Sequence, residues 1–255
     1  MVSRPIVIVG LGEMGSAFAH GWLRGGHTIV PVNRGDDPGA LDVEPELVLV
    51  AVGERELDDV LAALPAAWRD RAVLLQNELL PVDWERHGLT DPTVAVVWFE
   101  KKRSKPLNVV LPTVVFGPHA PLVVDAITAL RLPAEVGDPS RRLFELVKKN
   151  LYILTANIAG MVTGGTVAEL WRTHTPIAED VAREVLAIQA WRAQAELDED
   201  ALVKAMGEAF EADPGHACTG RSAPARLERA LAHAEEARID VPTLSEIAAL
   251  RLRGE

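Results

Sequence analysis

The chain has 255 residues, 48% of them hydrophobic, which is enough for one large or two modest domains with buried cores. Its net charge of −11 excludes nucleic acid or an anionic membrane surface as the main partner, since phosphate contacts require a basic face. Cys218 is the single cysteine, so an internal disulfide is excluded and we expect a small buried side chain. No apolar run reaches the roughly 18 residues of a membrane span, and the N-terminus lacks a secretory pattern. We therefore expect a cytoplasmic protein.

A glycine-rich loop follows the first predicted strand. Residues 6–9 (IVIV) predict a buried strand, and a G-x-G-x-x-G pattern follows directly. In a dinucleotide site the first glycine permits a tight turn, the second lets the backbone approach the pyrophosphate, and the third lets the next helix pack closely. A helix predicted over 16–24 supplies the anion-binding N-terminus. We expect cofactor contacts from the whole loop, that is from Gly10, Leu11, Gly12, Glu13, Met14 and Gly15.

The end of the second strand, predicted over 27–32, indicates which nucleotide binds. An acidic residue there accepts the ribose 2′-hydroxyl of NAD, whereas an arginine accommodates the 2′-phosphate of NADP. This strand ends in Asn33 and Arg34, and a guanidinium can stack on adenine and pair with a phosphate. We therefore predict NADP (as NADPH), with Asn33 and Arg34 in the site. Asp36 and Asp37 lie close behind and leave NAD as the alternative.

The following segments continue in β-α-β alternation to about residue 138. Runs that are apolar throughout predict buried strands, and two late strands flank a polar loop. The expected elements are strand 46–52, helix 57–64, strand 72–76, strands 93–99 and 107–116, and helix 122–130. We expect residues 1–138 to form a Rossmann-type nucleotide-binding domain. The basic cluster 101–105 is interpreted as a solvated hairpin tip.

The rest of the chain is helical in composition. Asp138-Pro139-Ser140 has the capping residue and the proline of a helix start, and no stop signal occurs before Gly164-Gly165. This pattern predicts a long helix over about 140–163. Further helices are predicted over 176–195, 198–210, 223–237 and 244–252. Residues 139–255 are thus expected to form an all-α domain, and the fold class is α/β with a helical second half.

Two polar side chains share one face of the long helix. Lys149, Ile153 and Asn157 are spaced four residues apart, about 6 Å per step along the axis. A lysine and an amide therefore point the same way. The same spacing also arises on a solvated helix face, and the neighbouring Lys148 fits that alternative.

Several separate stretches occur together in a characteristic order. They are the Gly10 to Gly15 loop, Arg34, Leu75-Gln76-Asn77, Glu145-Leu146 before Lys149, Asn157, and Glu169-Leu170. In this order and approximate spacing the chain resembles the ketopantoate reductase (2-dehydropantoate 2-reductase) family over nearly its full length. The resemblance implies a helical second domain like the C-terminal domain of 6-phosphogluconate dehydrogenase. It also implies that Lys149 protonates the carbonyl oxygen of the substrate, that Asn157 hydrogen-bonds the substrate, and that Asn77 lies near the nicotinamide ribose.

Some positions depart from that family. Glu78 follows Asn77 where glycine is usual, and Val52-Gly53, which we place beside the cofactor, stand where many members carry a lysine. A late serine and glutamate pair is not clearly present. Ser222 lies near the position of the glutamate, and we predict that it contacts the substrate. These departures leave the substrate open.

The predicted function is an NADPH-dependent reductase of a small 2-oxo acid or related carbonyl compound, with Lys149 as proton donor. One alternative is an imine or pyrroline reductase, which has a similar pair of domains but does not need Lys149. Another is a protein that binds NADP(H) without catalysis, as a sensor or scaffold. The seven histidines show no metal-ligand spacing, so no metal is assigned. Helices of the second half could also pair in a homodimer.

Overall fold

The computed structural model describes residues 4–101 and 107–253, and the chain divides into two units, Met1–Glu145 and Leu146–Glu255. The division falls inside one long helix, whereas the sequence-based boundary after residue 138 precedes that helix. Of the basic cluster 101–105, only Lys101 lies within the described residues.

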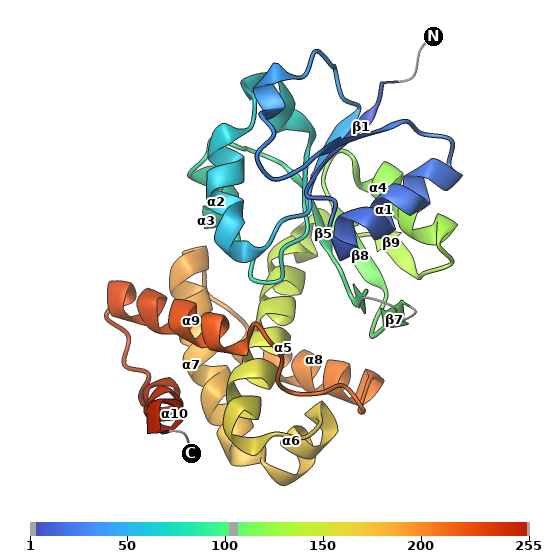
Figure 1. Cartoon of the computed structure of the whole chain (residues 1–255). Helices are drawn as coiled ribbons and strands as arrows, with labels where there is room; N and C mark the ends of the chain where they lie inside the picture. The colour runs from blue at the N-terminus through green and yellow to red at the C-terminus, as the bar shows by residue number, and fades with distance from the viewer. Residues whose placement is uncertain (1–3, 102–106, 254–255) are drawn as a thin grey trace. The chain divides into compact units, whose positions relative to one another are not determined.

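Seven strands of the first unit form one sheet (Figure 1). Its central strands are apolar and buried, as expected for parallel strands covered on both faces. The strands are β1 (Ile6–Val9), β2 (Ile29–Val32), β3 (Leu47–Val50), β4 (Ala72–Leu74), β5 (Thr93–Val96), β8 (Thr113–Phe116) and β9 (Ala134–Val136). Their order is β2-β1-β3-β4-β5-β8-β9, and all neighbours are parallel except β5 and β8. The register sets Val7 opposite Val30 on one side and Val48 on the other.

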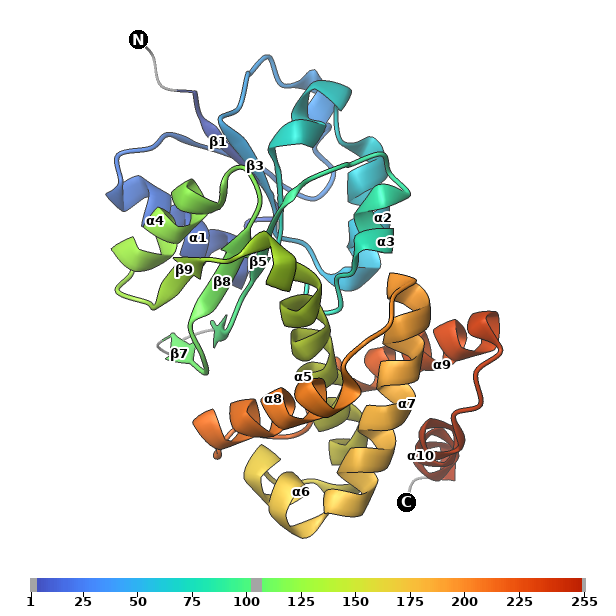
Figure 2. The same cartoon turned by 180° about the vertical axis from the view of Figure 1, so that it is seen from behind.

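Helices cover both faces of this sheet. In Figures 1 and 2, α1 and α4 lie side by side on one face, and α2 and α3 lie on the other. Their bounds are α1 (Glu13–Arg24), α2 (Glu54–Ala63), α3 (Pro81–Glu85) and α4 (Ala120–Ala129), with short 3-10 helices at Pro38–Ala40, Ala66–Arg71 and Pro139–Arg141. The layers are those of a doubly wound α/β fold.

Close backbone approach fixes α1 against α4. Phe18 and Trp22 of α1 are almost fully buried in the core, and the indole Nε1 of Trp22 donates a hydrogen bond to the carbonyl oxygen of Leu122, 3.0 Å away. At Gly21 an added Cβ would overlap the backbone carbonyl of Ala126. Glycine is therefore required at this crossing, because any side chain would force the two helices apart.

The two late strands are each shorter than predicted. The apolar run 93–99 leaves the main sheet after Val96, because the Trp98 N–H donates to the hydroxyl of Thr113 (3.1 Å) and the Trp98 carbonyl accepts from the N–H of Val110 (2.8 Å). Beyond this point β6 (Phe99–Glu100) and β7 (Asn108–Val109) form a separate antiparallel pair. Hydrophobicity alone predicts a strand here but not which sheet it joins.

Residues 142–253 of the described chain form six further helices, of which α5 runs from the first unit into the second. Their bounds are α5 (Arg142–Thr163), α6 (Val167–Thr173), α7 (Thr175–Ala193), α8 (Glu199–Ala212), α9 (Ala223–Ala237) and α10 (Pro242–Arg253). Gly164 and Gly165 end α5 with positive φ, as their position in the sequence predicts. The short α6 is not among the sequence-based elements; Thr166 and Glu169 form its capping box.

Aromatic contacts and a helix cap hold the second unit together. The ring of Phe210 on α8 lies 5.1 Å from that of Tyr152 on α5 and 5.9 Å from that of Trp171 on α6. The carboxylate of Glu184 on α7 accepts the N–H groups of Thr243 and Leu244 at 2.7 and 2.9 Å, which caps the start of α10. The second unit is thus an all-helical core with its own internal contacts.

Candidate functional site

The sheet order brings the predicted nucleotide residues of the first unit to one edge. Gly10 follows β1, Asn33 and Arg34 follow β2, Val52 follows β3, and Asn77 follows β4. These strands are parallel, so their carboxyl ends meet at the same edge of the sheet. The chain turns to opposite sides of β1 to form β2 and β3, and a doubly wound sheet opens a crevice at this point.

Three glycines of the loop meet different constraints. Gly10 has φ +91°, and an added Cβ would lie 2.8 Å from the carbonyl oxygen of Ala51. At Gly15 an added Cβ would overlap the carbonyl oxygen of Gly10. At Gly12, in contrast, an added Cβ would meet no atom within 4 Å. Gly10 and Gly15 are therefore required by the packing of the loop, whereas the absence of a side chain at Gly12 leaves a space open.

That open space lies at the N-terminus of α1. Gly12 is the N-cap of the helix, and it provides no side-chain cap for the first turn. The leading N–H groups of a helix have no partner within it and attract anions. Since Gly12 has no side chain and the space around it is open, the residues present fit a bound phosphate group.

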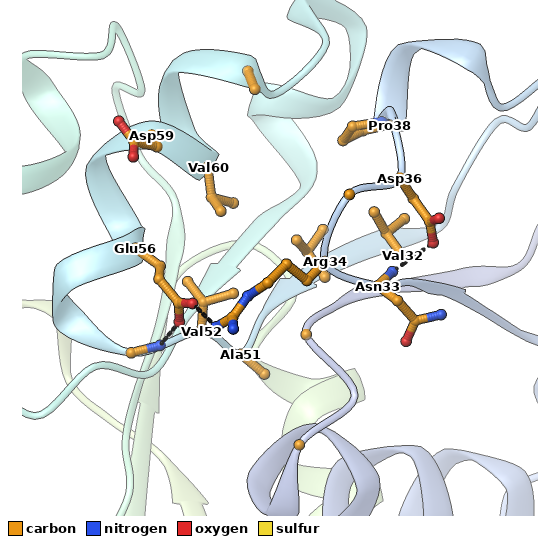
Figure 3. Close-up of a pocket in the computed structure, with 16 residues that line it drawn as sticks. Val32, Asn33, Arg34, Asp36, Pro38, Ala51, Val52, Glu56, Asp59 and Val60 are labelled. Atoms are coloured by element: carbon orange, nitrogen blue, oxygen red, sulfur yellow. Dashed lines mark hydrogen bonds and ion pairs between the residues drawn. The ribbon is translucent and has the colours of Figure 1, made fainter.

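A cavity of about 590 Å³ continues from this loop between β2 and α2 (Figure 3). Six of the residues predicted to bind the cofactor line it, namely Gly10, Gly12, Asn33, Arg34, Val52 and Gly53. The remaining predicted residues of the first unit are outside its lining, namely Leu11, Glu13, Met14, Gly15 and Asn77. Leu11 is exposed beside the loop, Gly15 is buried under it, and Asn77 is half-buried after β4.

Arg34 crosses the cavity and forms an ion pair with Glu56 on α2 (Figure 3). The side chain of Arg34 is 89% exposed and that of Glu56 is 43% exposed, so the pair lies at the mouth of the cavity. The second carboxylate oxygen of Glu56 accepts the N–H of Gly53, 3.3 Å away, and thereby caps α2. The guanidinium is held by one carboxylate that is itself fixed to the helix.

Two more carboxylates line the same cavity. The carboxylate of Asp36 accepts the N–H of Asn33 at 2.8 Å and closes the turn after β2, and Asp59 lies one turn along α2 from Glu56. Glu56 and Asp59 are absent from the sequence-based site. Glu56 has a detectable signal, because it stands at the third helical position after Gly53, where a glutamate caps the helix.

Gln76 connects the ends of two strands next to the cavity. Its side-chain amide donates to the carbonyl oxygens of Val50 and Val52 at 2.9 and 3.1 Å, and its oxygen accepts the N–H of Leu75. The N–H of the next residue, Asn77, donates to the carboxylate of Glu54 at 3.2 Å. Gln76 is buried and ties the end of β4 to the end of β3, so it positions the loop that contains Val52.

The residues predicted to perform catalysis lie in the second unit. Lys149 is half-buried on α5, with its ammonium nitrogen 5.7 Å from the ring centroid of Tyr152. Ser222 is exposed immediately before α9. Asn157 is buried; its amide oxygen accepts a hydrogen bond from Arg226 at 2.7 Å, and its amide nitrogen donates to the carbonyl oxygen of Cys218 at 3.1 Å.

Arg226 is a buried cation that the sequence-based site does not include. It lies on α9, 69 residues from Asn157, and only the fold brings the two together. Cys218 is fully buried, which confirms the expectation of a small buried side chain. Burial, together with the charge of Glu169, raises the pKa of its thiol to about 11, so the thiol is protonated and unreactive at neutral pH.

Among residues 4–101 and 107–253, no group of three or more metal-ligating side chains comes together. No helix in the same part of the chain is long and apolar enough to span a membrane.

The comparisons with known proteins identify the fold. No protein-family model matches the chain, and no curated protein does. Solved structures match over almost the full length and define a Rossmann-type unit followed by a helical unit, which confirms the predicted class of fold. More particularly, the chain has the fold of ketopantoate reductases.

Three of these structures show the extent of the likeness. A PanE/ApbA family ketopantoate reductase from Ralstonia eutropha has a TM-score of 0.68 at 20% identity, with 97% of each chain covered. A dimeric ketopantoate reductase from Staphylococcus aureus has a TM-score of 0.67 at 15% identity, covering 97% of this chain and 98% of that one. D-mandelate dehydrogenase with NADH and anilino(oxo)acetate has a TM-score of 0.69 at 13% identity, with 96% of each chain covered.

Proposed function

We propose that the protein is an NADPH-dependent reductase of a small 2-oxo acid. The observation that carries this proposal is the glycine loop with its open space at Gly12, in front of the N-terminus of α1 and beside the cavity that holds Arg34. Gly10 and Gly15 are needed for packing and Gly12 is not, and a glycine at this exposed position leaves the N-terminus of α1 accessible to an anion.

The first unit offers groups for each end of a dinucleotide. The N–H groups at the start of α1 would bind the pyrophosphate, and the guanidinium of Arg34 would pair with the 2′-phosphate of NADPH. Val52 and Gly53 lie beside this cavity, and Asn77 follows the next strand at the same edge. When bound, the cofactor supplies the hydride that reduces the carbonyl carbon.

Lys149 is the proposed proton donor. Addition of hydride to a ketone places negative charge on its oxygen, and an ammonium group that gives up a proton neutralises that charge. Asn157 and Ser222 are the proposed substrate contacts, through hydrogen bonds to a hydroxyl or carboxylate. For Asn157 this requires its amide to exchange or share the bonds that it makes with Arg226 and Cys218.

The structural neighbours support the choice of substrate class. Ketopantoate is a 2-oxo acid and mandelate is a 2-hydroxy acid, the oxidised and reduced forms of the same functional group, and the D-mandelate dehydrogenase structure contains NADH. The reductase from Staphylococcus aureus is described as dimeric, and a homodimer of this chain stays a prediction. Identities of 13–20% do not select one substrate among 2-oxo acids.

The test is oxidation of NADPH in the presence of a panel of 2-oxo acids that includes ketopantoate. Lys149→Ala should lower kcat about 100-fold or more, because it removes the proton donor. The Kd of this variant for NADPH should stay within about threefold of the wild-type value, since the residues proposed to bind the nucleotide are unchanged. Lys148→Ala, the neighbouring lysine on α5, is the matched control and should retain kcat within about threefold.

Other results would favour the alternatives. Full activity in Lys149→Ala would exclude Lys149 as proton donor and favour an imine or pyrroline type of reductase, which cyclic imines in the panel would reveal. Binding of NADPH without turnover of any compound would favour the sensor or scaffold function. Absence of binding would contradict the proposal at its first step.

A further inference from the structure

Arg34, the residue on which the choice between NADPH and NADH depends, is already paired with the carboxylate of Glu56. Arg34 is the only cationic side chain that lines the described cavity, and its guanidinium is bonded to the carboxylate of Glu56. Glu56 is not free to swing away without cost, because its other oxygen caps the first turn of α2 at Gly53. A second anion at Arg34 must therefore share the guanidinium or displace a capping carboxylate.

Of the carboxylates in the cavity, Glu56 is the one paired with Arg34. The described lining contains one cation, Arg34, and three carboxylates; Asp36 accepts the N–H of Asn33, and Asp59 points away from Arg34 (Figure 3). A 2′-phosphate adds a charge of about −1.5 to −2, and it would stand next to Glu56 if it paired with Arg34. A 2′-hydroxyl is neutral and can donate a hydrogen bond to a carboxylate. Glu56 thus opposes the phosphate and tolerates the hydroxyl.

We propose that Glu56 is a specificity-determining residue that sets the ratio of NADPH to NADH affinity through its hold on Arg34. This inference rests on the proposed function, because it assumes that the cavity takes the adenosine end of a nicotinamide dinucleotide. Glu56 lowers the affinity for NADPH and leaves the affinity for NADH nearly unchanged. The wild-type protein therefore prefers NADPH less strongly than a protein in which Arg34 had no carboxylate partner.

Glu56→Gln is the decisive variant. Glutamine keeps the length of the side chain and an acceptor oxygen for the N–H of Gly53, but it removes the negative charge from beside Arg34. The Kd values of NADPH and NADH are measured by fluorescence titration, and those of 2′,5′-ADP and 5′-AMP by calorimetry, so that the readout does not depend on turnover. The Kd of NADPH and of 2′,5′-ADP should fall about tenfold, and the Kd of NADH and of 5′-AMP should change less than about threefold.

Asp59→Asn is the matched control. It removes one negative charge from the same helix and cavity, and Figure 3 shows Asp59 pointing away from Arg34. The ratio of the two Kd values should change less than about threefold in this variant. Thermal unfolding of each variant verifies that α2 keeps its stability.

The outcomes separate the two proposals. If NADH and NADPH bind but Glu56→Gln leaves their ratio unchanged, or if Asp59→Asn changes it equally, the role of Glu56 is overturned and the proposed function stands. If none of the four ligands binds the wild type or the variant, dinucleotide binding itself is overturned, and the role of Glu56 falls with it.

Discussion

Asn157 uses both ends of its side-chain amide inside the helical unit. Its oxygen accepts from the buried Arg226, and its nitrogen donates to the carbonyl of Cys218. Asn157→Ala should therefore lower the free energy of unfolding by about 2 kcal/mol, because a buried guanidinium loses an acceptor. Urea unfolding at pH 7 measures this change.

A loss of activity in Asn157→Ala is then informative only at a temperature where the variant is fully folded. If the variant unfolds at the same urea concentration as the wild type, the hydrogen bond to Arg226 does not contribute to stability. In that case the amide is available to the substrate at no energetic cost.

The residues of the site that sequence reasoning found are those with a local pattern. Gly10, Gly12 and Arg34 lie within one strand-loop-helix-strand unit, and each follows a strand end that hydrophobicity predicts. Glu56 and Arg226 were missed because their partners, Arg34 and Asn157, lie 22 and 69 residues away. The contact that gives each of them a role exists only in the folded chain.

Among the elements, the crossing of α1 and α4 makes the sharpest prediction. Alanine is more favourable than glycine within a helix by about 1 kcal/mol. In Gly21→Ala, however, the new Cβ would overlap the carbonyl oxygen of Ala126. We expect a net loss of about 2 kcal/mol in the free energy of unfolding, because the overlap pushes the two helices apart. His20→Ala, an exposed change at the neighbouring position of α1, should alter the free energy of unfolding by less than about 0.5 kcal/mol.

Unfolding of both variants in guanidinium chloride measures these changes in the free energy of unfolding. Equal stability of Gly21→Ala and the wild type would contradict the close approach of α1 and α4. It would also remove the stated reason for a glycine at this position.

Most elements were predictable because their patterns are strong. Buried parallel strands such as β1 and β3 are apolar throughout, and α9 (Ala223–Ala237) has the bounds that its composition predicts. β9 was missed, since its three residues Ala134–Val136 are partly exposed and carry no apolar run. The split of β5 from β6 depends on hydrogen bonds of Trp98 to Thr113 and Val110, which sequence periodicity does not encode.

At the scale of the whole molecule, the likeness to known structures covers nearly the whole chain, whereas the residues proposed to act are divided between the two units. Structures of ketopantoate reductases match 97% of the chain, yet the cavity that holds Arg34 lies wholly in the first unit and the predicted proton donor in the second. A ligand that binds only the folded protein stabilises it by about 2.7 kcal/mol at a concentration 100 times its Kd. Binding of NADPH should therefore raise the unfolding temperature.

Titration of NADPH into the wild type and into Gly12→Val tests whether the glycine loop binds a dinucleotide. We expect the wild type to bind NADPH and the variant to lose affinity about 100-fold, because a valine side chain at the N-cap of α1 takes up space that is open in the wild type. The variant should remain folded, with a loss of about 1 kcal/mol in unfolding free energy from the poorer N-cap. Equal Kd values for the two proteins, or no binding to the folded wild type, would contradict binding of a dinucleotide by this loop.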